Sequence, residues 1–215
     1  MLVRSVSDIW NKVYRNDASF FGDSPSNFAL ECYDEFKEHR VKKILELGCG
    51  QGRDSIFFAS NDIDVVALDS SHVAVELLSK ITNEKNLSIR PMTHNVNQGI
   101  PFDDSSFDAV YSHMFFNMRF SADKIKYLFV EVNRVLKKEG FNLFSVRSDH
   151  DPMCGKGTLV EEGIYEINSF QIRFFTKSNI EDIVTKTGFN LYKISEAYEE
   201  PVNLYCVYTN KVTSN

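Results

Sequence analysis

Short β-rich runs alternate with segments of helical period from Lys43 to the end of the sequence. The runs predicted as strands are Ile44–Leu47, Asp64–Leu68, Ser88–His94, Phe107–Ser112 and Phe141–Val146. Between them, Ser70–Thr82 and Ser121–Gly140 carry apolar residues at helical spacing, and Gly140 is expected to end the second helix. This alternation predicts βαβ units around a mostly parallel sheet.

The C-terminal part of the sequence has a different pattern. A loop is expected at 148–163, then a hairpin at 164–176, a helix at 178–187 closed by Gly188, and strands at 189–198 and 202–210. Two strands separated by so few residues are antiparallel, because a parallel return needs a crossover. The predicted fold class is therefore α/β, a doubly wound, Rossmann-like sheet with helices on both faces and one antiparallel strand near its edge.

The first 40 residues form an aromatic-rich leader, predicted as two helices around a loop at Asn16–Pro25. The sequence shows no internal repeat and no Pro, Gly or Ser-rich linker that would split it. We therefore expect a single domain over residues 1–215, with the leader at 1–40 and the core at 41–215.

Charge and length limit the classes of function. The chain has 215 residues and a net charge of −6, and its Lys and Arg residues are scattered, which disfavours a nucleic-acid partner. No apolar run approaches the ~20 residues that cross a bilayer, and the N-terminus lacks the apolar region of a secretory signal, so no membrane partner and a cytoplasmic location are expected. The oligomeric state is left open.

The cysteines and histidines predict no metal site. The four cysteines stand far apart without a C-x-x-C pair, which favours reduced thiols over disulfides or zinc ligands. The five histidines show no H-x-x-x-H spacing.

Three alternate glycines, Gly48, Gly50 and Gly52, follow the first predicted strand. Without a Cβ they permit turns with positive φ and let a ligand approach the main chain. In a doubly wound sheet the ligand crevice opens at the carboxyl ends of the strands, where this turn lies. A dinucleotide fingerprint, G-x-G-x-x-G, would need glycine at position 53, which is Arg.

Asp69 ends the second predicted strand and could accept both hydroxyls of an adenosine ribose. Dinucleotide-binding folds use the same contact, so Asp69 alone does not separate the two ligand classes. The alternative is a helix N-cap, a role that Ser70 or Ser71 could also fill.

With the segment "HNVNQGIPFDDSSFDAVYSHMFF", the sequence resembles the class I S-adenosylmethionine-dependent methyltransferases. Residues 46–52, "ELGCGQG", resemble their first motif, Asp69 their ribose acid, and "IPFDDSSFDAVYS" the region of their fourth strand. The resemblance runs from Lys43 to the C-terminus and implies S-adenosylmethionine as the cofactor. Asn95 departs from the usual Asp near the adenine amino group, although its amide oxygen can still accept.

More narrowly, "WNKVYRNDASFFGDSPSNF", "GCGQGRDSIFFA" and "FFTKSNIEDIVTKTGF" resemble small-molecule methyltransferases of the tellurite-resistance type, whose leader closes over the cofactor. The resemblance implies the following cofactor-binding residues: Trp10, Tyr14, Phe21, Glu46, Gly48, Cys49, Gly50, Gln51, Gly52, Asp69, Ser70, Asn95, Val96 and Ser112. Trp10 and Tyr14 could instead belong to a helix that simply packs on the sheet.

Methyl transfer from a sulfonium is an in-line displacement, so orientation of the acceptor supplies much of the rate. His113 at a strand end is a candidate to orient the acceptor or take its proton, or it lines the wall. Arg147 could clamp an anionic acceptor or pair with Asp149 or Asp151. Other candidates on these loops are Asn117, His150 and Cys154.

The sequence thus predicts an S-adenosylmethionine-dependent methyltransferase (EC 2.1.1.-) acting on a small molecule, with His113 and Arg147 as catalytic candidates. Two alternatives remain: a protein or nucleic-acid methyltransferase, which the acidic balance disfavours, and a non-catalytic S-adenosylmethionine-binding domain. The acceptor is not predicted, because its pocket is built from variable loops.

Overall fold

The structure, a computed structural model, describes residues 5–168 and 170–212. The chain divides into two compact units. One contains the residues up to Gln98 together with 107–111, and the other contains 99–106 and the residues from Ser112 onward. Hydrogen bonding orders the strands of the main sheet as β3-β2-β1-β4-β5-β10-β9. This mostly parallel sheet confirms the predicted α/β class.

The first unit is built on parallel strands. They are β1 (Lys43–Leu47), β2 (Asp64–Asp69), β3 (Ile89–Thr93) and the first part of β4 (Phe107–His113). Leu47 pairs with Leu68, and Asp69 pairs with Thr93. The carboxyl ends of β1, β2 and β3 therefore meet at one edge, where a doubly wound sheet binds its ligand.

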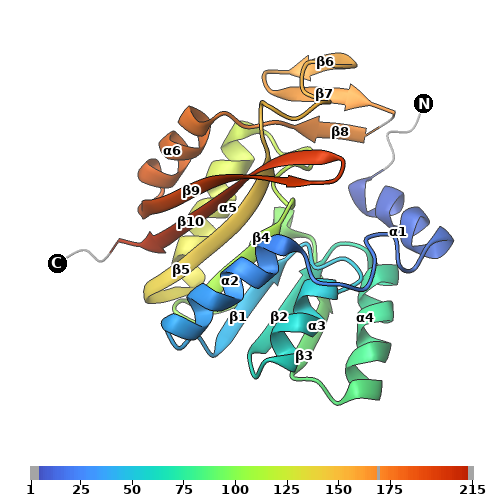
Figure 1. Cartoon of the computed structure of the whole chain (residues 1–215), viewed down its shortest axis with the longest axis vertical. Helices are drawn as coiled ribbons and strands as arrows, with labels where there is room; N and C mark the ends of the chain where they lie inside the picture. The colour runs from blue at the N-terminus through green and yellow to red at the C-terminus, as the bar shows by residue number, and fades with distance from the viewer. Residues whose placement is uncertain (1–4, 169, 213–215) are drawn as a thin grey trace. The chain divides into compact units, whose positions relative to one another are not determined.

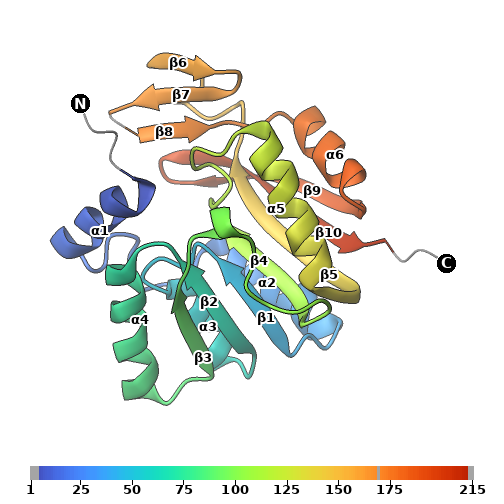
Figure 2. The ribbon, with the colours of Figure 1, turned by 180° about the vertical axis from the view of Figure 1, so that it is seen from behind.

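The helices of this unit begin at side-chain or glycine caps. They are α1 (Val6–Asn16), α2 (Asn27–Glu38), α3 (Arg53–Ser60) and α4 (His72–Lys85), with a 3₁₀ turn, η1, at Val96–Gln98. Ser5, Ser26 and Ser71 accept a backbone N–H at the starts of α1, α2 and α4. Figure 1 shows α2 and α3 on the same side of β1 and β2, and the rear view in Figure 2 agrees.

The second unit has its own sheet elements and helices. They are α5 (Ala122–Val135), β5 (Leu136–Arg147), β6 (Thr158–Glu161), β7 (Ile164–Ile167), β8 (Phe170–Arg173), α6 (Lys177–Lys186), β9 (Phe189–Glu199) and β10 (Val202–Lys211). β10 is antiparallel to both β5 and β9, which confirms the one reversed strand near the edge. α5 covers one face of β5 (Figures 1 and 2).

The second predicted helix, expected to end at Gly140, is shorter in the structure. α5 ends at Val135, and β5 begins at Leu136, so Gly140 lies within a strand. The carbonyls of Arg134 and Val135 accept the N–H groups of Ser105 and Ser106, and the Lys211 ammonium donates to the carbonyls of Asn133 and Leu136. These partners, distant in sequence, satisfy the last carbonyls of the helix and allow the chain to turn into β5.

The predicted loop at 148–163 contains a strand. β6 pairs antiparallel with β7, which pairs antiparallel with β8 in a separate three-stranded sheet. All four residues of β6 are exposed. An exposed edge strand has no buried face and so leaves no alternation for sequence analysis to detect.

Candidate functional site

The glycine turn begins directly after β1. The N–H groups of Gly48 and Cys49 both donate to the carbonyl of Leu68 on β2, at 2.8 and 3.0 Å. Gly52 has φ +87°, and a Cβ there would lie 2.3 Å from a methyl carbon of Leu78. The third glycine therefore allows the start of α3 to pack closely against α4.

Gly50 lies directly against a side chain of the leader. Its φ is +53°, and a Cβ at this position would stand 2.4 Å from the hydroxyl oxygen of Tyr14 on α1. Tyr14 is buried, and burial together with the charge of Asp69 raises the pKa of its hydroxyl. The hydroxyl of Tyr14 is therefore neutral and packs over the bare backbone of the turn.

Asp69 holds the turn as well as facing the edge of the sheet. One carboxylate oxygen accepts the N–H of Gly50 at 2.8 Å, and the other accepts the N–H of Ser71 at 2.7 Å. Ser71 is the N-cap of α4, so Asp69 is not itself the cap, and Ser70 lies between them. Burial raises the pKa of Asp69, while its backbone hydrogen bonds oppose that shift. The backbone of Ser70 also donates to Asp69. A carboxylate has about four acceptor positions, so these three protein donors still allow a further bond to a ligand.

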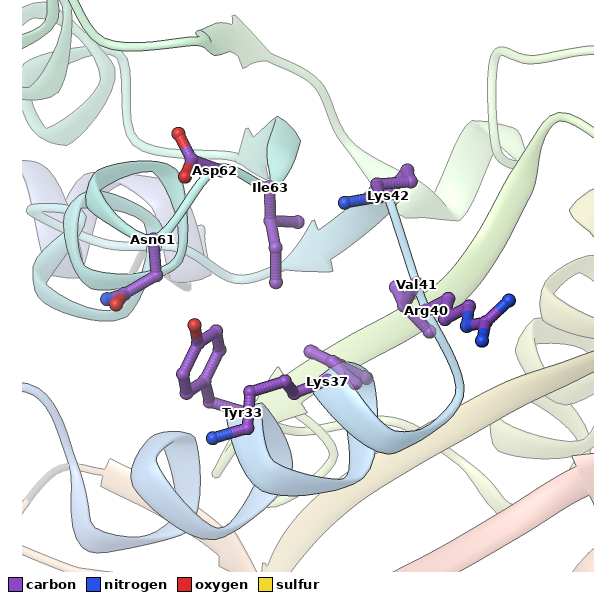
Figure 3. Close-up of a pocket in the computed structure, with 9 residues that line it drawn as sticks. Tyr33, Lys37, Arg40, Val41, Lys42, Asn61, Asp62 and Ile63 are labelled. Atoms are coloured by element: carbon purple, nitrogen blue, oxygen red, sulfur yellow. The ribbon is translucent and has the colours of Figure 1, made fainter.

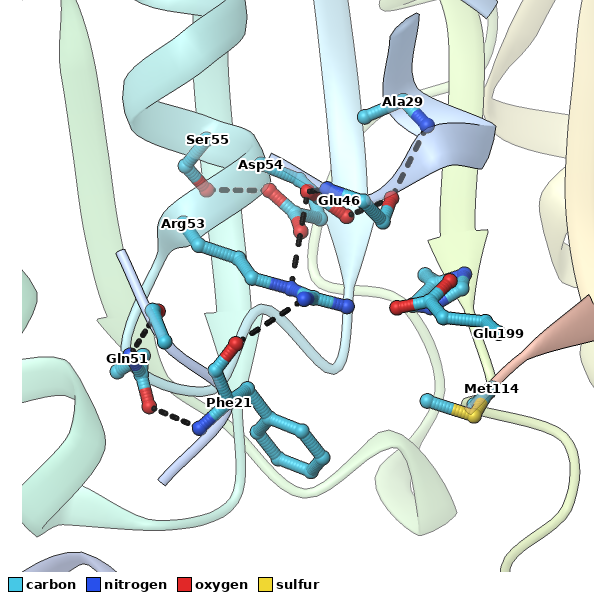
Figure 4. A network of polar contacts seen from close by, with 12 residues as sticks. Phe21, Ala29, Glu46, Gln51, Arg53, Asp54, Ser55, Met114 and Glu199 are labelled. Atoms are coloured by element: carbon cyan, nitrogen blue, oxygen red, sulfur yellow. Dashed lines mark hydrogen bonds and ion pairs between the residues drawn. The ribbon is translucent and has the colours of Figure 1, made fainter. Parts of the chain in front are cut away.

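Glu46 is a buried acid beneath the turn. Its carboxylate accepts the hydroxyl of Ser55 on α3, as Figure 4 shows. Burial, followed by the nearby charge of Asp54, raises the pKa of Glu46 well above its usual value. Cys49 is also buried, and its thiol pKa is likewise raised by burial. The turn thus carries a concentration of acidic groups in a region of low solvation.

Gln51 clamps the leader loop with both ends of its amide. Its oxygen accepts the N–H of Phe21 at 3.2 Å, and its NH₂ group donates to the carbonyl of Gly22 at 2.7 Å (Figure 4). Arg53 donates to the carbonyl of Phe21 at 3.1 Å. Trp10 completes an aromatic cluster, with ring centroids 5.8 Å from Tyr14 and 5.9 Å from Phe21. The three aromatic residues expected at the cofactor therefore lie together, anchored to the glycine turn.

Asp54 fixes the second leader helix, a role that the sequence reading missed. Its carboxylate accepts the N–H of Ser26 at 2.7 Å, the hydroxyl of Ser26 at 2.9 Å and the hydroxyl of Tyr111 at 2.7 Å. Ser26 is at the same time the N-cap of α2. In the sequence, only the charged pair Arg53-Asp54 after the glycine turn indicated a role for Asp54. This pair could not predict hydrogen-bond partners that lie 28 and 57 residues away.

A second contact missed by the sequence reading joins α1 to α4. The side-chain oxygen of Asn11 accepts the hydroxyl of Ser71 at 2.8 Å. Arg15 lies 3.3 Å from the ring of His72, measured between its guanidinium nitrogen and Nε2. The leader is therefore tied to the strand edge at both of its helices.

Asn95 and Val96 lie at the loop after β3. The side-chain oxygen of Asn95 accepts the N–H of Asn97 at 3.0 Å, which starts the 3₁₀ turn, and Asn95 is otherwise exposed. Val96 is buried, and the carbonyl of Asp69 accepts the N–H of His94. The amide of Asn95 is thus presented at the same edge as Asp69.

In the second unit, the end of β4 carries Ser112 and His113. The hydroxyl of Ser112 is buried and has no hydrogen-bond partner among the described residues. The ring of His113 lies between two groups: Nδ1 is 2.7 Å from the hydroxyl of Ser145, and Nε2 is 3.3 Å from a carboxylate oxygen of Glu199. Sequence reading found His113 but not Glu199, which comes from β9.

Arg147 is engaged by a neighbouring carboxylate. Its Nε and one Nη donate to the two oxygens of Asp151, at 3.1 and 2.7 Å, and the Asp151 side chain is fully buried. Of the two interpretations, the geometry favours pairing over an anion clamp. Among the other candidates, Asn117 accepts the backbone N–H of Arg147, and Asp149 accepts the hydroxyl of Tyr205.

Two further loop candidates lie near these residues. His150 lies 3.2 Å from Glu196 at the surface. Cys154 is half-buried, and its thiol pKa is raised, chiefly by burial. Neither makes a contact that indicates a ligand.

A small hollow of about 220 Å³ lies elsewhere in the first unit (Figure 3). It is lined by Tyr33, Phe36, Lys37, Arg40, Val41, Lys42, Asn61, Asp62 and Ile63. The segments 40–42 and 61–63 immediately precede β1 and β2, so the hollow is at the amino-terminal ends of these strands. It contains none of the predicted site residues.

Within residues 5–168 and 170–212, no group of three or more His, Cys, Asp or Glu side chains is arranged to hold a metal ion. No helix in this described part is both long and apolar enough to pass through a bilayer.

Part of the chain is similar to known proteins. Residues 44–140 match the family model described as "Methyltransferase domain". The chain is 26% identical over 147 residues to the uncharacterized methyltransferase YcgJ of Bacillus subtilis, a match that covers 66% of this chain and 54% of YcgJ. It is 25% identical over 113 residues to the probable S-adenosyl-L-methionine-dependent methyltransferase TehB of Haemophilus influenzae, covering 52% of this chain and 38% of TehB. The matches thus cover about half or less of these relatives' own lengths.

Among solved structures, the fold is similar to a Burkholderia thailandensis 1,6-didemethyltoxoflavin-N1-methyltransferase with bound 1,6-didemethyltoxoflavin and S-adenosylhomocysteine. The TM-score is 0.73 at 13% identity, and the match covers 97% of this chain and 88% of the other. At this identity the similarity supports the fold alone.

Proposed function

We propose that this chain transfers a methyl group from S-adenosylmethionine to a small-molecule acceptor, because residues 44–140 match a methyltransferase-domain model and the chain is similar to a probable S-adenosyl-L-methionine-dependent methyltransferase. The observation that carries the proposal is the glycine turn at the carboxyl ends of β1 and β2, with Glu46 below it and Asp69 beside it. This arrangement offers both a bare backbone and acidic acceptors at one edge.

The chemistry of these residues fits the cofactor. S-adenosylmethionine supplies an activated methyl group on a sulfonium and carries a ribose diol, an adenine and an ammonium. Glu46 and Asp69 are acceptors whose pKa values are raised chiefly by burial, so a cationic ligand beside them would favour their ionised forms. A positively charged ligand with hydroxyl groups would supply the cation and the hydrogen-bond donors that these acidic acceptors can bind.

Each residue of the turn has a proposed part. Asp69 accepts ribose hydroxyls, Asn95 contacts the adenine amino group, and Glu46 faces the ammonium. The remaining proposed contacts form the walls: Gly48, Cys49 and Gly50 with their main chain, Ser70 and Val96 beside the adenosine, and Trp10, Tyr14 and Phe21 as the cover. Gln51 and Gly52 act indirectly, through the leader clamp and the packing of α4.

Two observations support a small acceptor over a macromolecule. The leader lies over the glycine turn through Tyr14 and the Gln51 clamp, which favours a covered pocket over an open surface. The net charge of −6 disfavours a nucleic-acid backbone. A structural relative whose name specifies a small heterocyclic substrate is consistent with this proposal.

The test has two parts. Calorimetry with S-adenosylhomocysteine measures cofactor binding, and a variant that removes the ribose acceptor, Asp69→Ala, serves as the negative control. Tritiated S-adenosylmethionine is then supplied with separated small-molecule, protein and RNA fractions of a cell extract. Label in the small-molecule fraction supports the proposal. Label confined to protein or RNA, or binding without any transfer, would instead support one of the two alternatives.

A further inference from the structure

Arg53 brings a positive charge to the acidic glycine turn of the first unit. It is the first residue of α3 and directly follows Gly52, the last glycine of the turn. Its side chain is only 15% exposed. An arginine guanidinium is not deprotonated in proteins, so this partly buried charge is permanent.

The contacts of the guanidinium fix its position, as Figure 4 shows. One Nη of Arg53 donates to the carbonyl of Phe21 at 3.1 Å, and the guanidinium carbon lies 5.8 Å from the centroid of the Phe21 ring. Nε stands 3.9 Å from a carboxylate oxygen of Asp54, which is longer than a hydrogen bond. The oxygens of Asp54 accept hydrogen bonds from Ser26 and Tyr111. Asp54 therefore acts on Arg53 through its charge, whereas Phe21 takes one of the five N–H donors.

The positive charge of Arg53 acts on both Glu46 and Tyr14. Burial and then Asp54 raise the pKa of Glu46, and Arg53 acts on it in the opposite direction. The pKa of Tyr14, whose hydroxyl packs on Gly50, is raised chiefly by burial, and Arg53 again opposes the shift. Arg53 is therefore within electrostatic range of the buried acid and of the side chain that covers the bare backbone.

An acid and an arginine that act on each other are complementary to an α-amino acid. The methionine end of S-adenosylmethionine carries an ammonium and a carboxylate on one carbon, so both charges arrive together. A carboxylate that met only Glu46, Asp54 and Asp69 would be repelled by them. The guanidinium of Arg53 has a planar fork of donors that matches a carboxylate. A phosphate is a poorer match, because its larger negative charge would meet the same acids.

We infer that Arg53 binds the α-carboxylate of S-adenosylmethionine, beside the ammonium site at Glu46; this rests on the proposed methyltransferase function. Phe21 holds the guanidinium from the leader, and the ligand carboxylate accepts other N–H groups of the same side chain. Arg53 thereby distinguishes the cofactor and its product, S-adenosylhomocysteine, from adenosine thioethers that lack an amino-acid end.

The test compares two ligands that differ only in the carboxylate. S-adenosylhomocysteine has both charges, and its decarboxylated analogue, S-adenosyl-3-thiopropylamine, keeps only the ammonium. The analogue is the more positive ligand, so an acidic turn without a carboxylate site would bind it at least as tightly. With Arg53 in the inferred role, calorimetry should show the wild-type protein binding S-adenosylhomocysteine at least tenfold more tightly than the analogue, because charge-assisted hydrogen bonds are strong.

Three variants assign this preference to a residue. Arg53→Met removes the charge and should lower the ratio of the two affinities at least tenfold. Any loss that acts through the leader lowers both affinities alike and cancels in this ratio. Arg53→Lys, which keeps a point charge without the fork, should retain part of the preference. The matched control is Arg40→Met, at an exposed arginine near the amino-terminal end of β1, which should change the ratio less than twofold.

Two outcomes would overturn the inference. The first is a wild-type protein that binds the analogue as tightly as S-adenosylhomocysteine, a result that does not depend on whether any variant folds. The second is an Arg53→Met protein that loses the same factor in affinity for both ligands, which would leave Arg53 only its contact with Phe21. Failure of the proposed function looks different. A wild-type protein that binds neither ligand contradicts both proposals, whereas one that binds both ligands equally contradicts only the role of Arg53.

Discussion

Tyr14 places its hydroxyl oxygen 2.4 Å from the position that a Cβ on Gly50 would occupy. The leader helix α1 therefore packs against the glycine turn at the contact between Tyr14 and Gly50. A side chain on Gly50 would both displace Tyr14 and force a non-glycine residue to keep a φ of +53°. The absence of a side chain at Gly50 is therefore needed for the packing of Tyr14, in addition to any contact with a ligand.

Gly50→Ala is therefore expected to destabilise the fold. A left-handed conformation costs a non-glycine residue about 1–2 kcal/mol, and overpacking against Tyr14 costs about 1–3 kcal/mol. In the Tyr14→Phe background, where the closest atom is gone, the same substitution should cost at least about 1 kcal/mol less. Urea denaturation of the four proteins measures this difference. Additive effects of the two substitutions would mean that the leader does not press on the turn.

Asp69→Ala is expected to weaken S-adenosylhomocysteine binding at least tenfold, because hydrogen bonds to charged groups contribute roughly 1.5–3 kcal/mol. Asp69→Asn should lose less, since its amide oxygen can still accept the N–H of Gly50. Calorimetry compares both with Asp64→Ala, a substitution at the opposite end of the same strand. Unchanged affinity in a folded Asp69→Ala protein would remove Asp69 from the site.

Glu46 predicts a pH dependence of stability. Its pKa is raised in the folded protein, so the folded state binds its proton more tightly than the unfolded state does. Stability must then fall as the pH rises from the unfolded pKa, roughly 4.3, through the higher folded value. Asp54, Asp69 and Arg53 also act on this group, the first two raising its pKa and the last lowering it.

Glu46→Gln removes this titration and keeps an oxygen for the hydroxyl of Ser55. The free energy of unfolding of Glu46→Gln relative to the wild type should therefore increase between pH 5 and pH 8. Chemical denaturation at several pH values measures the difference. A difference that stays constant with pH would show that Glu46 ionises as readily in the folded protein as in the unfolded chain.

The sequence was sufficient for features that depend on nearby residues. The glycine turn, Asp69 at the end of β2 and the reversed β10 all follow from local spacing and short connections. What could not be predicted depends on partners distant in sequence. The end of α5 is set by Ser105 and Ser106, which satisfy its last carbonyls.

The same limit applies to the candidate site. The side chain of Asp54 reaches Ser26 and Tyr111, and the ring of His113 lies between Ser145 and Glu199. No sequence pattern predicts these contacts. Sequence spacing identified which residues could do chemistry, whereas the side chains that contact them come from distant parts of the chain.

The leader supplies the last prediction. The N–H of Phe21 donates to the side chain of Gln51, so exchange of this single amide reports whether the loop is closed on the turn. We expect S-adenosylhomocysteine to slow exchange across residues 10–25, because a ligand between the turn and the leader adds contacts to both. Lid loops commonly close in this way over a bound ligand.

Gln51→Ala is expected to speed exchange at Phe21 without ligand and to leave Ala29 unchanged, since the N–H of Ala29 is held by Ser26, which Asp54 anchors separately. Asn61→Ala, which removes a side-chain bond at the other end of α3, is the matched control. Hydrogen exchange of the three proteins, with and without S-adenosylhomocysteine, measures these effects. If the ligand protects Gly48–Gly52 but adds nothing at 10–25, the leader is a fixed part of the core, and Trp10, Tyr14 and Phe21 pack there without covering the ligand.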